Sequence, residues 1–234
     1  MALRAHALAL CLAVLTSLAS PALADGMEGL TPDSAAAEIY GFDQLKGLGE
    51  EAELVFDYRL EGRMVDEAFA DEVILAFKRA GKKGDHGYDV AATLFAKGAA
   101  REIGPLVASK FNPILLIFFQ HDVNQMSRGT GGSSHYFRNV IRHSMGMKGA
   151  FRAEDVTAEV AGKTVKARRI SFTPFVSDSH KAQMSKLMTK RYSITVSDEV
   201  PGGIVALETA TPAPPDQPGE GPMLHEIYQL REVR

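Results

Sequence analysis

Residues 112–145 constrain the fold of this chain more than any other stretch. Asn112 and Pro113 precede six consecutive apolar residues, 114–119. Asparagine accepts hydrogen bonds from the free amides of a first helical turn, and proline at that place loses no helical hydrogen bond. Six apolar residues in a row need cover on most sides, whereas a membrane span takes about 20. The stretch therefore predicts a helix buried inside a domain.

A glycine turn separates this helix from a second one. Gly129, Gly131 and Gly132 end the first helix, and Ser133 and Ser134 are natural caps for the next. The second helix has an apolar face, formed by Tyr136, Phe137, Val140, Ile141 and Met145. Its other face is polar and basic, formed by His135, Arg138, Asn139, Arg142 and His143. The pattern predicts an α-hairpin that is apolar inside and basic outside.

The N-terminus has the features of a secretory signal peptide, which we place at residues 1–24. Arg4 precedes a run of mostly apolar and small residues, 7–18, and Ala22-Leu23-Ala24 matches an A-x-A cleavage signal. We expect cleavage after Ala24 and export into a bacterial periplasm. The apolar run is too short for a membrane anchor.

The mature chain, residues 25–234, is expected to form a single β-rich domain with a helical insertion at 112–146. The one cysteine, Cys11, lies in the signal peptide, so the mature chain has no disulfide and no cysteine metal ligand. No second segment approaches the length of a membrane span, so we expect no transmembrane segment after cleavage. The net charge of −3 argues against a nucleic-acid partner.

Short alternating segments predict seven to nine strands around the α-hairpin. The clearest are residues 52–60, 73–78, 88–96, 156–160, 164–172, 192–196, 204–208 and 223–233. Residues 34–40 predict a short helix, and residues 178–190 predict a further helix with Met184, Leu187 and Met188 turned inward. We therefore expect an α+β fold: a curved antiparallel sheet, or half-barrel, with the α-hairpin and a further helix on its concave side.

This arrangement resembles the periplasmic lipoprotein-carrier half-barrels, the Lol-type superfamily. The shared features are the exported, thiol-free chain, the strand meander and helices lying in the concavity. The residues concerned are 54–60, 73–77, 164–172, 192–196 and 204–208, with 112–145 as the plug. The resemblance implies binding of acyl chains, or a place in envelope assembly, without catalysis. The basic face of residues 134–143 is a departure from that pattern.

The glycine turn is a candidate anion site, because free amides at a helix N-terminus attract negative charge. Arg128, His135, Arg138 and Arg142 flank it, and Phe118, Phe119 and Tyr136 could line an apolar cavity. The candidate ligand-binding residues are therefore Arg128, Gly131, Gly132, Ser133, Ser134, His135, Arg138, Arg142, Phe118, Phe119 and Tyr136. The alternative is a plain connector that needs glycine for its backbone.

Other chemistry finds less support in the sequence. His121, His135 and His143 suggest a metal site, but Asp122 is the one carboxylate in the α-hairpin, so we expect no metal and no cofactor. A hydrolase would use His135 or His143 as its base, yet the chain lacks a G-x-S-x-G elbow. We assign no catalytic residue. The predicted function is binding or carriage of a lipid or another apolar or anionic envelope ligand. The alternatives are an envelope hydrolase and a non-catalytic envelope assembly protein, with an envelope protein as partner.

Overall fold

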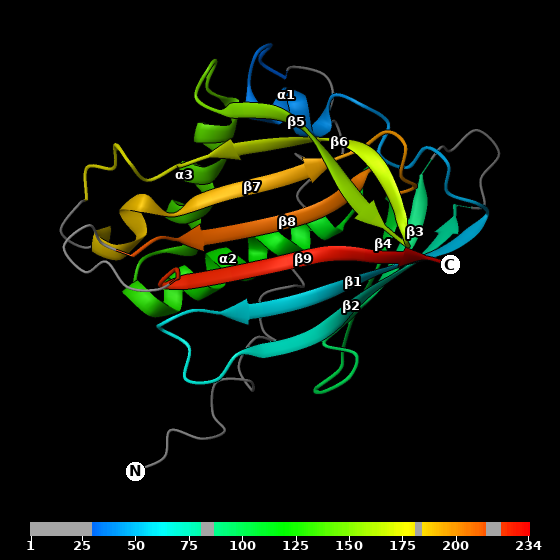
Figure 1. Ribbon diagram of the computed structural model, residues 1–234, viewed down its shortest axis with the longest axis horizontal. Coiled ribbons are helices and arrows are strands. Elements are labelled where there is room, and N and C mark those ends of the chain that lie inside the picture. Colours follow the sequence, from blue (N-terminus) through cyan, green and yellow to red (C-terminus); the bar gives the residue numbers. More distant parts are fainter. Residues whose placement is uncertain (1–29, 81–86, 181–183, 214–220) are drawn as a thin grey trace.

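The structure is a computed structural model that describes residues 30–80, 87–180, 184–213 and 221–234. The predicted signal peptide, residues 1–24, lies outside the described residues. Within them the chain forms one antiparallel sheet and three α-helices (Figure 1). The α+β class and the open curved antiparallel sheet expected from the sequence agree with this architecture.

The sheet has nine strands in the order β4-β3-β2-β1-β9-β8-β7-β6-β5. Every pair but one joins strands that are consecutive in the chain; the exception is β1 with β9, which brings the first and last strands together in the middle of the sheet. The strands are β1 (Glu51–Glu61), β2 (Phe69–Arg79), β3 (Tyr88–Leu94), β4 (Arg101–Ser109), β5 (Arg152–Val160), β6 (Lys163–Phe172), β7 (Arg191–Val196), β8 (Ile204–Thr211) and β9 (Leu224–Val233).

The helices are α1 (Ala35–Tyr40), α2 (Ile114–Thr130) and α3 (Ser134–Gly146). Figure 1 shows α2 crossing behind β8 and β9, on the side of the sheet that we call the inner face. The predicted α-hairpin is confirmed: α2 and α3 contact each other, and α1 contacts α3 and β6. Ser34 begins α1 by accepting a hydrogen bond from the Ala37 amide, at 3.1 Å.

Asn112 fixes the start of α2, as its place before proline predicts. Its Oδ1 accepts a hydrogen bond from the Ile114 amide at 3.2 Å, and its Nδ2 donates to the Gly202 carbonyl at 2.7 Å. The Asn112 amide donates to Gln44 Oε1 at 2.9 Å. Gly202 has a φ of 87° and lies so close to Leu54 that a Cβ would be 2.4 Å from Leu54 Cδ1. The β7–β8 turn and the start of α2 are therefore held together by one buried set of contacts.

The apolar run of α2 lies against the inner face of the sheet. Phe118 is fully buried, and its ring contacts those of Tyr192 and Tyr228, with centroids 6.2 and 5.7 Å apart. Leu116 and Phe119 are half-buried, because they lie toward the edges of the contact. The buried residues of α2 are Ile114, Leu115, Ile117, Phe118, Asp122, Val123 and Met126.

The helix predicted at residues 178–190 is right in part: the segment is helical from Met184, whose amide donates to the His180 carbonyl at 3.0 Å, and residues 181–183 lie outside the described residues. The described part of this segment holds turns up to His180 and a 3-10 helix, η3, at Ser185–Thr189. Met184 and Leu187 do turn inward, but their spacing of three residues suits a 3-10 helix as well as an α-helix. Lys190 then reaches toward α2, and the chain enters β7 at the next residue. In its described part, the further helix predicted on the inner side thus ends as the 3-10 helix η3.

The β5–β6 hairpin bends over the opposite, outer face of the sheet. At its tip the Ala161 amide donates to the Arg231 carbonyl of β9 at 3.2 Å. Val160, next to that tip, is 7% exposed, and Val55 and Val205 on β1 and β8 are at most 1% exposed. The outer face therefore has an apolar part under the hairpin and a polar part beyond it.

Replacing Phe118 by alanine tests how much the α2 contact contributes to stability. We expect Phe118→Ala to lower the free energy of unfolding by about 3–5 kcal/mol, because it leaves a cavity between α2 and two tyrosine rings. The exposed Arg142 on α3 is the control, and Arg142→Ala should change it by less than about 0.5 kcal/mol. Urea unfolding measures both. A loss below about 1 kcal/mol for Phe118→Ala would contradict the docked position of α2.

Candidate functional site

The glycine turn uses most of its own amides. The amide of Gly131, where φ is 71°, donates to the Ser127 carbonyl at 2.9 Å, and that of Gly132 donates to Thr130 Oγ1 at 3.1 Å. Ser133 Oγ accepts from the His135 amide at 3.2 Å. These donors already have acceptors within the chain. The hydrogen bonds of the turn are therefore those of an ordinary helix connector. The positive charge needed to bind an anion would come from side chains around the turn.

The side chains predicted to bind ligand divide between the two ends of α2. Phe118 is 13 positions before Gly131, so at 1.5 Å per residue they are about 20 Å apart along the helix. His135 and Arg128 are exposed at the turn end, Ser134 is half-buried there, and Arg142 is exposed more than two turns further along α3. Arg138 Nη2 donates to Gln120 Oε1 at 3.0 Å, so the Arg138 side chain points toward the first half of α2 and away from the turn. The structure therefore does not bring all these residues into one site.

Tyr136 is engaged in a polar contact. Its hydroxyl donates to Asp178 and lies 3.1 Å from His180 Nδ1. Burial, followed by the hydrogen bond and the charge of Asp178, raises the pKa of Tyr136 to about 12. The contact attaches the first turn of α3 to the segment before η3, so Tyr136 ties two elements together.

Two consecutive residues of α2, His121 and Asp122, make the shortest polar contacts between α2 and the sheet, and Gln125 Nε2 adds a longer one to Glu226 Oε1 at 3.4 Å. Asp122 is fully buried and accepts hydrogen bonds from Lys190 Nζ and from the Tyr192 hydroxyl. Lys190 and Tyr192 are at most 1% exposed. Burial, and then the nearby Asp122 carboxylate, raise the pKa of Tyr192 well above its usual value. We call these three residues the Asp122 anchor.

The neighbouring residue, His121, makes the second polar contact, which we call the Glu226 anchor. His121 Nδ1 lies 2.8 Å from Glu226 Oε1, and the Tyr58 hydroxyl donates to the same oxygen at 2.9 Å. The Tyr228 hydroxyl is 3.1 Å from His121 Nδ1. Burial raises the pKa of Glu226, but the hydrogen bond and charge of His121, together with Lys190 and Tyr58, outweigh it and hold that pKa below its usual range.

The two anchors differ in their exposure to water. The Asp122 anchor is sealed, whereas the His121 side chain is 23% exposed. Aromatic rings surround the Glu226 anchor: the Phe95 centroid is 6.0 Å from that of His121 and 5.3 Å from that of Tyr58. Phe69 lies 5.7 Å from Phe95, between centroids, and is 38% exposed. The inner face therefore opens to solvent beside His121, between the β1–β2 and β3–β4 connections.

The anchors were missed by the sequence analysis because their partners are far apart in the chain. The sequence suggests metal ligation or a hydrolase triad for Asp122 and His121, and Glu226 is 105 positions from His121. One signal was present: Glu226 shares the inward positions of β9 with Tyr228 and Leu230, and a carboxylate at such a position requires a partner. Lys190 gave no comparable signal, because the segment before it was predicted to be helical.

The described part of the chain holds no group of three or more His, Cys, Asp and Glu side chains placed to bind a metal ion. Nor does any helix in that part have the length and apolarity needed to cross a membrane.

Comparisons with known proteins give similarity to solved structures but to no protein family. No protein-family model matches the chain, and no curated protein matches it. A solved structure, described as an outer membrane lipoprotein-sorting protein domain from Vibrio parahaemolyticus, is similar over 86% of this chain and 90% of that one. The sequence identity is 9% and the TM-score is 0.21, values too low to support an assignment of fold or function.

The Asp122 anchor should be stabilising only as a complete set. Asp122→Asn leaves the Lys190 ammonium buried without its counter-charge, and should lower the free energy of unfolding by about 3–5 kcal/mol. The triple replacement Asp122→Leu, Lys190→Met, Tyr192→Phe removes every polar group together and should be within about 2 kcal/mol of the wild type. Chemical unfolding distinguishes them. A triple variant as unstable as Asp122→Asn would contradict this account.

Glu226 should contribute to stability in a definite pH window. Its pKa is lower in the folded state than the ordinary value of 4.5, so its contribution is present above about pH 4.5 and is lost as pH falls through the folded pKa. Glu226→Gln should therefore flatten the loss of stability between about pH 5 and pH 3. Glu67→Gln, at an exposed glutamate, controls for removal of one carboxylate. An unchanged acid profile for Glu226→Gln would contradict the assignment.

Proposed function

We propose that this chain is an exported periplasmic carrier, with residues 25–234 as its mature domain, that binds a lipid or a similar amphiphile with an anionic group. In this proposal the α2–α3 hairpin occupies the inner face of the sheet when no ligand is bound, and leaves it when ligand enters. The observation that carries the proposal is the polar character of the α2 contact: buried carboxylates at Asp122 and Glu226 lie within the otherwise mainly apolar contact between α2 and the sheet.

The polar anchors support a reversible contact for an energetic reason. Burial of apolar area contributes about 25 cal/mol per Å² and has no preferred orientation. A buried ion pair contributes little net stability, because desolvation of both charges offsets their attraction. It does specify position, since a shifted helix would leave a buried charge unpaired. The anchors thus place α2 in one register without adding much to the free energy that holds it there.

The exposed inner face would suit an amphiphile. With α2 displaced, the buried rings of Phe172, Tyr192 and Tyr228 would meet acyl chains, and the Lys190 ammonium would be released from Asp122. Phe172 and Tyr192 are stacked, 5.2 Å apart at 9° between planes, and form a flat apolar surface. An anionic headgroup would replace the Asp122 carboxylate at Lys190.

The residues at the glycine turn have a related role in the proposal. Gly131, Gly132, Ser133 and Ser134 set the angle between α2 and α3. Arg128 and His135 lie at that end of the hairpin, and Arg138 and Arg142 add positive charge further along α3. Such a surface attracts anionic membranes over the Debye length, about 8 Å at physiological salt. Phe118, Phe119 and Tyr136 would exchange their present contacts for contacts with ligand or solvent.

A hydrolase based on the α-hairpin has less geometric support. Within the described residues neither His135 nor His143 has a carboxylate partner that would orient it as a general base. A structural assembly protein differs from a carrier in one testable respect: its α2–α3 hairpin would never leave the inner face of the sheet.

Transfer of a fluorescent phospholipid from vesicles of phosphatidylglycerol tests the carrier function. The mature wild-type chain should form a stable protein–lipid complex, separable from vesicles by size. Asp122→Asn should increase uptake severalfold, because it weakens the attachment of α2. The triple Asp122→Leu, Lys190→Met, Tyr192→Phe should reduce uptake, because it keeps α2 docked and removes the cation. Arg59→Gln, on the outer face, is the control; absence of uptake by all variants would favour the assembly protein.

A further inference from the structure

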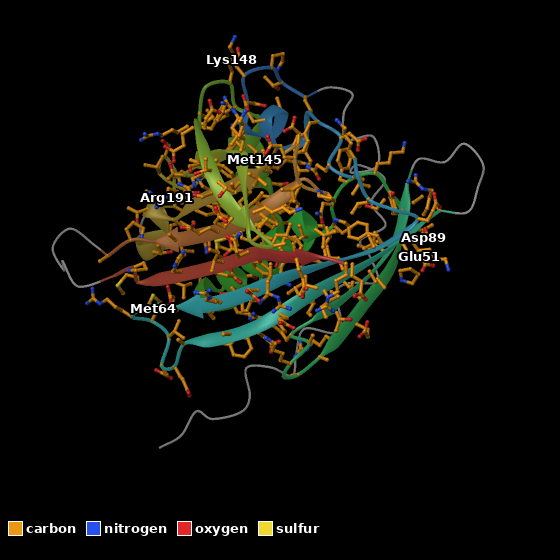
Figure 2. All side chains as sticks on the ribbon, turned by 45° about the vertical axis from the view of Figure 1, so that its right-hand side comes forward. Glu51, Met64, Asp89, Met145, Lys148 and Arg191 are labelled. Atoms are coloured by element: carbon orange, nitrogen blue, oxygen red, sulfur yellow. The ribbon has the colours of Figure 1, made fainter. Side chains whose placement is uncertain are left out.

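The outer face of the sheet has two adjoining hollows, away from α2. Tyr192 of β7 points to α2, so its neighbours Arg191 and Ser193 point to the outer face, because side chains alternate along a strand. The first hollow has a volume of about 610 Å³ and the second about 570 Å³, and Thr173, Arg191 and Glu208 line both. Figure 2 labels Arg191 at the end of the sheet opposite Glu51 and Asp89.

Strand register produces the floor of the first hollow. Ser171 of β6 is paired with Arg152 of β5 on one side and with Ser193 of β7 on the other. Ser193 is paired in turn with Glu208 of β8. Four strands therefore present a row of polar side chains with two short members between two long ones. The short serines leave the space, and the long side chains at either end enclose it.

The serine pair has hydrogen-bonding capacity left over. Ser171 Oγ and Ser193 Oγ are 3.1 Å apart, and either can donate to the other. Each hydroxyl has one proton, so the pair uses one and keeps one for another acceptor. Phe151, which is half-buried and also packs against the hydrophobic core, borders the hollow.

Among the charged residues that line the hollows, one cation makes no ion pair with a described residue. Glu154 lies 3.6 Å from Arg152 and 3.4 Å from Arg169, measured between charged atoms. Glu208 Oε1 lies 3.2 Å from His225 Nε2, at an angle that does not make a hydrogen bond. Arg191 is exposed and has no ion pair among the described residues. The unpaired guanidinium thus lies at the junction of the two hollows.

We propose that the first hollow binds a small anionic sugar, one that has a phosphate or carboxylate group on a hydroxyl-rich ring. Arg191 binds the anionic group through its fork of N–H donors. The serine pair and the Glu208 carboxylate bind ring hydroxyls, and Phe151 contacts the apolar side of the ring. The volume lies within the range of small-ligand sites, about 300–1,000 Å³. The site is on the face opposite α2, so it does not depend on the carrier function.

Calorimetric titration of the mature chain tests this site with four probes: glucose 6-phosphate, glucuronate, glucose and inorganic phosphate. The two charged sugars should bind more tightly than either glucose or phosphate, since each engages both Arg191 and the hydroxyl-binding floor. Arg191→Gln should weaken their binding at least about tenfold, the effect of losing one charge-assisted contact. Arg59→Gln, which removes another exposed arginine of the outer face without touching the hollows, should leave binding unchanged.

Three results would overturn the proposal. The first is absence of binding by both charged sugars at concentrations up to about 10 mM. The second is inorganic phosphate binding as tightly as glucose 6-phosphate, which would mean that the hollow recognises an anion alone. The third is an Arg191→Gln variant with wild-type affinity. Thermal melting checks that each variant is folded, and Glu208→Gln, which should weaken the binding of both sugars, provides a second test if Arg191→Gln unfolds.

Discussion

A curved antiparallel sheet has an inner face that must be kept from water, and α2 is the element that covers it here. Phe118 meets the rings of Tyr192 and Tyr228, which come from strands on either side of β8. The first and last strands of the sheet pair beside this contact, so α2 also bridges segments that are far apart in the chain. Removal of α2 would expose apolar surface from both halves of the sheet at once.

Two adjacent residues of α2 give that contact its position. Consecutive helical residues point about 100° apart, so His121 and Asp122 reach in different directions from one turn. Asp122 reaches Lys190 and Tyr192 at β7, and His121 reaches Glu226 and Tyr228 of β9. A helix one residue out of register would lose both sets of partners and bury their charges unpaired. The two anchors contribute little to the free energy of folding but select one register of α2 on the sheet among several possible apolar packings.

The sequence predicts the structure correctly where a local pattern of residues determines the conformation. The apolar run 114–119, Asn112 before Pro113, and the glycine turn each specify a local conformation, and the helix pair follows from them. Strand alternation predicted most of the sheet. It did not predict strand order, so neither the pairing of β1 with β9 nor the contact of Glu226 with His121 could be predicted. The contact of Lys190 with Asp122 could not be predicted for the same reason, because the two residues are 68 positions apart in the chain.

Strand β7 is where the two faces of the sheet meet. Its pleat sends Tyr192 inward to Asp122 and sends Arg191 and Ser193 outward, within three consecutive residues. A period of two therefore places an apolar, sealed environment and a polar, solvent-filled one on opposite sides of a single backbone. The residues that attach α2 share no side chain with those that line the outer hollow, and a substitution in one set leaves the chemistry of the other intact. The proposed lipid uptake and the proposed sugar binding can consequently be tested separately, and the failure of either would leave the physical basis of the other unchanged.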